Sequence, residues 1–122
     1  MKIGLDIHGV IDSNFKMFCE LTNMLVREGH EVHVITGPSE SLVENMLKDN
    51  DIVYTHFFSI VDNAKKNNIG IRLDEDGNPW IDGDFWDRSK AKYCEEQGID
   101  LHLDDSDIYG KHFKTPYARF KK

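Results

Sequence analysis

The chain has 122 residues, with 22 acidic and 15 basic side chains and a net charge of −7. This length predicts a single domain over residues 1–122, and the excess of acid disfavours non-specific binding to nucleic acid. No apolar run approaches the roughly 20 residues that span a bilayer, so no membrane partner is expected. The N-terminus lacks a signal-peptide pattern and the two cysteines form no CxxC motif, which predicts a cytoplasmic protein with buried, reduced thiols.

Strands and helices are predicted to alternate along the chain. Short apolar runs predict strands at 2–7, 31–36, 53–58 and 100–103, and helical spacing of apolar residues predicts helices at 14–28, 39–48, 60–68 and 89–97. A last short strand is expected near 112–116. This alternation predicts an α/β fold, a Rossmann-like three-layer sandwich with a central parallel sheet and helices on both faces.

Residues 70–83 interrupt the alternation. Residues 71–73 and 79–81 read as two short strands, and Asp76-Gly77 supplies a turn between them. The segment therefore predicts a β-hairpin insertion. Trp80 and Trp86 flank its acidic end and are expected to pack the hairpin onto the core, with base stacking as the alternative.

Chemically active side chains follow the predicted strands. Asp6, Thr36 and the pair Asp104-Asp105 stand where three strands end, and Lys90 opens the helix before the last of them. Each residue alone is as well explained by a helix cap or a turn. Because the carboxyl ends of parallel strands form the ligand-binding edge of such sheets, the ordered set favours a functional site.

The residue types at this edge suit phosphoryl transfer. Clustered carboxylates repel one another unless a cation lies among them, and oxygen ligands suit Mg²⁺. A carboxylate beside Mg²⁺ can attack phosphorus, and the transferred group then needs positive charge and hydrogen-bond donors. Lys90, the Thr36 hydroxyl and backbone N–H groups near Gly9 and Gly37 are the candidate donors.

Four short motifs appear in a fixed order: Leu-Asp-Ile-His-Gly-Val at 5–10, Val-Ile-Thr-Gly at 34–37, Ser-Lys-Ala at 89–91 and Leu-His-Leu-Asp-Asp-Ser at 101–106. With this set the chain resembles the haloacid dehalogenase (HAD) superfamily of phosphatases and phosphotransferases. The resemblance covers nearly the whole sequence. Only about 24 residues separate Asp12 from Thr36, which leaves no room for a cap domain and implies a small capless member with an open site.

The resemblance implies a role for each motif residue. Asp6 would be the nucleophile, Thr36 would hold the phosphoryl group, and Lys90 would balance the charge between them, with Lys92 as a less favoured substitute. The implied Mg²⁺ ligands are Asp6, the backbone carbonyl of His8, Asp104 and Asp105, of which Asp105 is favoured as a direct ligand and Asp104 would bind directly or through water.

His8 departs from the family pattern, which has an acid/base aspartate at this position. Imidazole has an ordinary pKa near 6.5 and can both donate and accept a proton near neutral pH. Three interpretations stay open: His8 is a working acid/base, the site has lost turnover and only binds, or the reaction is a slow phosphotransfer or another chemistry.

The sequence therefore predicts a Mg²⁺-dependent phosphomonoester hydrolase acting through Asp6. The alternative is a catalytically degenerate HAD-fold protein that binds a phosphorylated ligand or a protein partner. The expected substrates are a phosphorylated small molecule or a macromolecular phosphomonoester, with nucleic acid only as a phosphorylated end, and a homo-oligomer is compatible with either. A receiver domain is disfavoured because its acidic pair and lysine occur in the opposite order.

The histidines outside the first motif show no metal-binding pattern in the sequence. His30, His56 and His112 have no partner spacing that suggests zinc, so no zinc site is predicted. His33 and His102 lie inside predicted strands and are expected to be structural or sheet-edge residues.

Overall fold

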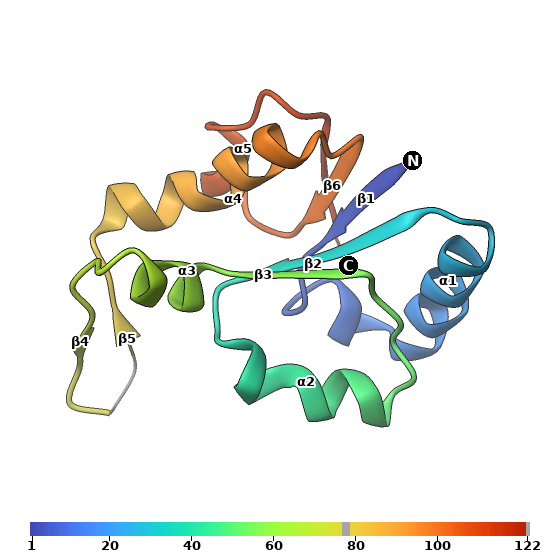
Figure 1. Ribbon diagram of the computed structural model, residues 1–122, viewed down its shortest axis with the longest axis horizontal. Coiled ribbons are helices and arrows are strands. Elements are labelled where there is room, and N and C mark those ends of the chain that lie inside the picture. The colour runs from blue at the N-terminus through green and yellow to red at the C-terminus, as the bar shows by residue number, and fades with distance from the viewer. Residues whose placement is uncertain (77–78, 122) are drawn as a thin grey trace.

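Five short strands form one parallel sheet in the computed structural model, which describes residues 1–76 and 79–121 (Figure 1). The strands are β1 (Lys2–Leu5), β2 (Glu31–Thr36), β3 (His56–Ser59), β6 (Leu101–Asp104) and β7 (Tyr117–Arg119). Their order across the sheet is β3-β2-β1-β6-β7, and each neighbouring pair is parallel. The α/β architecture with a parallel sheet is the predicted one.

Helices cover both faces of the sheet, because successive side chains of a buried parallel strand point to opposite faces. The helices are η1 (Ile11–Ser13), α1 (Phe15–Arg27), α2 (Glu40–Asp49), α3 (Ile60–Lys66), α4 (Gly83–Gln97) and α5 (Asp107–Gly110). Val34 of β2 belongs to the core shared with α1 and α2, whereas Ile35 packs with Cys94 of α4. Figure 1 shows α1 and α2 on one side of the sheet and α4 on the other. No helix among the described residues is long and apolar enough to cross a membrane.

Most predicted elements are present, with shifted ends. The strand at Glu31–Thr36 has the predicted bounds, but the last strand lies at Tyr117–Arg119 instead of 112–116. The predicted helix start at Ser89 is wrong, because α4 begins six residues earlier at Gly83. Asp82 caps it by accepting a hydrogen bond from the Phe85 N–H. Lys90 therefore lies in the middle of the helix.

The predicted hairpin is present as a two-stranded antiparallel ribbon, β4 (Arg72–Leu73) and β5 (Pro79–Trp80). Gly77 of the predicted turn lies outside the described residues. Figure 1 shows the ribbon projecting from one end of the molecule. Trp80 is exposed, so the prediction that it packs the hairpin onto the core is wrong. Trp86 does pack there, as predicted, beside Ile81 and Val61 of α3.

Both cysteines are free thiols, as predicted, but only Cys94 is buried; the expected burial of Cys19 is wrong, because it lies half-exposed on α1. Cys94 is buried between α4 and the sheet, and burial raises the pKa of its thiol to about 12. Because the thiolate is the reactive form, this side chain contributes packing and not chemistry.

Candidate functional site

A tight turn after β1 builds one wall of the site. Asp6 extends the pairing of β1 with β6 through its N–H, which donates to the Leu103 carbonyl at 3.0 Å. The chain then reverses through Gly9, whose φ of +85° suits glycine. A Cβ at Gly9 would overlap the Asp105 carboxylate. The absence of a side chain at Gly9 thus lets the loop after β1 lie directly against the loop after β6.

The predicted residues meet in an open hollow of about 280 Å³ at the carboxyl edge of the sheet. Six of them line it: Asp6, His8, Thr36, Gly37, Lys90 and Asp105. The other two lie just outside it, Gly9 against Asp105 and Asp104 fully buried next to Lys90.

Lys90 is the buried cation of the site. It is 2% exposed, and its Nζ lies 3.3 Å from Asp6 Oδ1 and 2.8 Å from Asp104 Oδ2. Burial works to lower the pKa of Lys90, but Asp6 and Asp104 together raise it above its ordinary value. Lys92 is 77% exposed and pairs with Glu96 on the helix surface, so the geometry selects Lys90 over Lys92.

Asp104 is held by internal donors. Its Oδ2 accepts from Lys90 and from His102 Nε2 at 3.0 Å, and its Oδ1 accepts from the Ser106 N–H. Burial alone would raise the pKa of Asp104, but the hydrogen bonds from His102 and Lys90 bring it below the ordinary range. His102 is fully buried and orients this carboxylate, which fits the structural role expected of it.

Asp6 is a buried carboxylate whose ionised form is destabilised by its loss of contact with water. Burial raises its pKa to about 6; Lys90 opposes the rise and Asp104 adds to it. Its Oδ1 also accepts from the Ile7 N–H at 2.8 Å. A second cation beside Asp6 would therefore stabilise its charged form.

The acidic residues fit a hard divalent cation. Oxygen atoms of Asp6, Asp104 and Asp105 all lie within 4.8 Å of one another. Asp105 is exposed and lines the hollow, whereas the oxygens of Asp104 already accept internal hydrogen bonds. Within residues 1–76 and 79–121, the carbonyls of Asp6 and Ile7 accept backbone hydrogen bonds but that of His8 accepts none. These oxygens are the ligand type that Mg²⁺ prefers.

His8 has a partner that the sequence reasoning missed. Its side chain is 61% exposed, and its Nδ1 lies 3.0 Å from Oδ2 of Asp12. Asp12 Oδ1 accepts a hydrogen bond from the Gly9 N–H at 2.7 Å. This amide, a predicted donor to the phosphoryl group, therefore donates within the loop instead. Because a carboxylate only accepts hydrogen bonds, the proton of neutral His8 lies on Nδ1 and leaves Nε2 unprotonated. The four-residue spacing in the sequence was the available signal.

Two aromatic residues complete the hollow: Trp86, for which ligand stacking was only the alternative prediction, and Tyr109, which was not predicted. The Trp86 Nε1–H donates to the Tyr109 hydroxyl at 2.6 Å, and Lys90 Nζ lies 4.6 Å from the centroid of the Tyr109 ring. A Cβ at Gly37 would lie 2.8 Å from Trp86 Cζ2, so the indole packs closely on this glycine. The turn after β2 thus depends on a residue of α4.

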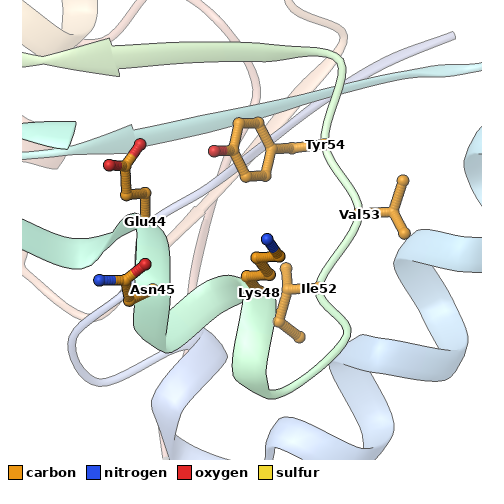
Figure 2. Close-up of a pocket in the computed structure, with 6 residues that line it drawn as sticks. All are labelled: Glu44, Asn45, Lys48, Ile52, Val53 and Tyr54. Atoms are coloured by element: carbon orange, nitrogen blue, oxygen red, sulfur yellow. The ribbon is translucent and has the colours of Figure 1, made fainter. Parts of the chain in front are cut away.

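A second surface hollow, of about 530 Å³, lies apart from these residues (Figure 2). Figure 2 shows Glu44 and Lys48 of α2 on one side and Tyr54, from the segment before β3, on the other. It contains none of the predicted site residues.

At the level of architecture, the chain is an α/β protein whose sheet edge carries an acidic cluster beside a buried lysine. Comparisons with protein families, with curated proteins and with solved structures find no match for this chain.

Proposed function

We propose that the protein is a Mg²⁺-dependent phosphomonoester hydrolase of the haloacid dehalogenase type, which acts through a phosphoryl group carried on Asp6. One observation carries the proposal: Asp6, at the end of the first strand, lies 3.3 Å from a buried lysine and within 4.8 Å of two further carboxylates. This arrangement combines a nucleophile, a fixed cation and ligands for a second cation.

The first step would transfer the phosphoryl group to Asp6. Ile7 and Lys90 lie against Oδ1, so we assign the attack on phosphorus to Oδ2, and the bond to the leaving oxygen breaks. Mg²⁺ held by Asp6, Asp105, the His8 carbonyl and, directly or through water, Asp104 would offset the charge of the phosphate and the carboxylates. Lys90 and the Thr36 hydroxyl would bind the equatorial oxygens.

His8 would move the protons. Its imidazolium would donate to the leaving oxygen, and the neutral ring would then take a proton from the water that hydrolyses the phosphoryl-aspartate. Asp12 supports both roles, because it keeps the Nδ1 proton in place and leaves Nε2 as the exchanging atom. The contact favours the interpretation of His8 as a working acid/base over that of a disabled site.

The hollow is small and open, which constrains the substrate. A volume of about 280 Å³ accommodates the phosphoryl group with a small leaving alcohol beside Trp86 and Tyr109, and a larger substrate would extend through the open side into solvent. Both small phosphomonoesters and the phosphorylated end of a macromolecule meet this condition.

The proposal is tested by phosphate release from an aryl phosphate and a broad phosphomonoester panel with Mg²⁺. We expect turnover by the wild type, loss of at least about 1,000-fold in Asp6→Asn, and no change in the exposed control Asp49→Asn. Equal inactivity of wild type and Asp6→Asn across the panel would overturn the enzyme proposal.

The variant His8→Asp distinguishes a working acid/base histidine from a site that has lost turnover and only binds. Reduced activity shows that the imidazole works in turnover. Activity gained over an inactive wild type shows a disabled site, and supports the binding-protein alternative.

A further inference from the structure

We propose a second metal site, for Zn²⁺, formed by Glu31 and His33 of β2 and His56 of β3, although the sequence alone predicted no zinc site at His56. It lies near the start of β2, whereas Thr36 of the phosphoryl site ends the same strand. Along the strand, Thr36 is five positions from Glu31 and three from His33, or about 17 Å and about 10 Å at about 3.3 Å per residue. The two sites are therefore separate.

Strand pairing brings the three side chains together. Glu31 and His33 are two residues apart and so lie on the same face of β2, and His33 is in register with His56 of the neighbouring strand. The two imidazole rings stack with centroids 4.2 Å apart and planes 3° from parallel.

The donor atoms converge on one carboxylate oxygen. Glu31 Oε1 lies 2.9 Å from His33 Nε2 and 3.6 Å from His56 Nδ1, and the three atoms are all within 4.8 Å of one another. A tetrahedral zinc ion with bonds of about 2.0–2.2 Å holds its ligand atoms about 3.3–3.6 Å apart. The distance from Glu31 to His33 must open by a few tenths of an ångström, and the distance from Glu31 to His56 already fits. Two parallel rings cannot both direct an in-plane lone pair at one ion, so the exposed His56 ring must rotate out of the stack when zinc binds.

The surrounding groups are compatible with binding. Tyr93 Oη lies 2.7 Å from His33 Nδ1, where it can accept a hydrogen bond from the Nδ1–H once Nε2 binds the metal. Lys2 Nζ lies 3.9 Å from Oε2 of Glu31, the oxygen that does not face the imidazoles. Thr55 Oγ1 lies 2.9 Å from His56 Nδ1, so binding replaces that hydrogen bond with a metal bond.

The ligand set selects the class of ion. Two imidazoles and one carboxylate suit Zn²⁺ and similar transition ions, whereas Mg²⁺ prefers oxygen ligands. His33 is buried, but His56 is 46% exposed and gives the ion an access route. An ion bound here would join β2 to β3 and raise the melting temperature of the protein.

The test is Zn²⁺ titration of the chelator-treated full chain by calorimetry. We expect one site whose affinity falls at least about tenfold in His56→Gln and in Glu31→Gln, and about ten- to a hundredfold in Tyr93→Phe. The matched control His112→Gln and the acidic-cluster variant Asp105→Asn should bind Zn²⁺ with the affinity of the wild type. Equal affinity in wild type and His56→Gln overturns the proposal. Loss in Asp105→Asn alone also overturns it, because it would place zinc among the acids.

A second measurement needs only the wild-type protein. In imidazole ¹⁵N spectra, Zn²⁺ should shift the ring nitrogens of His33 and His56 and leave those of His112 in place. Shifts confined to the other histidines would contradict the site, whatever the stability of the variants.

Discussion

At the scale of single residues, the contact between His8 and Asp12 matters most for the proposed reaction. A histidine in place of an acidic acid/base residue must present a defined nitrogen, and an exposed ring by itself exchanges freely between tautomers. The 3.0 Å contact from Nδ1 to Asp12 holds one tautomer, and the bond from Gly9 to the same carboxylate holds the loop. Asp12 is thus a positioning residue.

We expect Asp12→Asn to lower kcat by about ten- to a hundredfold with little change in KM. The amide still accepts the Gly9 N–H through its oxygen, but its NH₂ group now faces His8 and moves the ring proton to Nε2. Steady-state kinetics and the ¹⁵N shifts of His8 measure the two effects separately.

The control is the same change in the His8→Asp background, where no tautomer has to be held and Asp12→Asn should cost little. An unchanged His8 tautomer in Asp12→Asn would disprove the positioning role even if the protein has no phosphatase activity.

At the scale of elements, the candidate site depends on the stability of α4, because this helix carries both Lys90 and Trp86. Gly98 caps the C-terminus of the helix; its φ of +68° is left-handed, and its N–H donates to the Cys94 and Glu95 carbonyls. The first residue of the helix is also a glycine, Gly83, without a positive φ. A Cβ added at either position would meet no other atom within 4 Å.

The two glycines form a matched pair for denaturant unfolding. Gly98→Ala should lower the free energy of unfolding by about 1–2 kcal/mol, because alanine is strained in the left-handed region. Gly83→Ala should leave it unchanged or raise it by up to about 1 kcal/mol, because alanine favours helix. Equal effects of the two changes would contradict the backbone explanation.

At the scale of the whole molecule, the sheet concentrates buried charge at one edge. Asp6 and Asp104 share Lys90, so two carboxylates depend on one buried ammonium. Asp104 obtains most of the available hydrogen bonds, and Asp6 is left with a raised pKa. The ionised form of Asp6, the proposed nucleophile, therefore destabilises the folded protein.

This cost predicts a pH-dependent effect of Asp6→Asn on the metal-free protein. A pKa raised from 3.8 to about 6 makes the wild type lose stability as pH rises through that range, because the folded state resists ionisation of Asp6. Asparagine does not ionise, so the variant should become more stable than the wild type, by up to about 3 kcal/mol above pH 7 and by much less at pH 4.5.

Urea unfolding in EDTA at the two pH values measures the difference, with Asp49→Asn as the control. A difference that does not change between pH 4.5 and 7.5, or a destabilised Asp6→Asn, would contradict this explanation.

Much of the fold could be predicted because its signals are local. The apolar runs and turn residues of 31–36 and 14–28 determine β2 and α1 to within about a residue at each end. The start of α4 could not be predicted in this way, because Asp82 reads equally well as part of the hairpin and as a helix cap. That error of six residues left the choice between Lys90 and Lys92 open, since the phase of the helix decides which lysine faces the sheet.

By itself, the sequence determined the α/β class and the acids, threonine and lysine that gather at the carboxyl edge, because alternation and strand ends are properties of consecutive residues. Only the tertiary structure decided which side chains meet across elements: Lys90 with Asp6, Trp86 with Gly37, and His33 with His56. These contacts depend on helix phase and strand register, which are set by packing across the whole sheet.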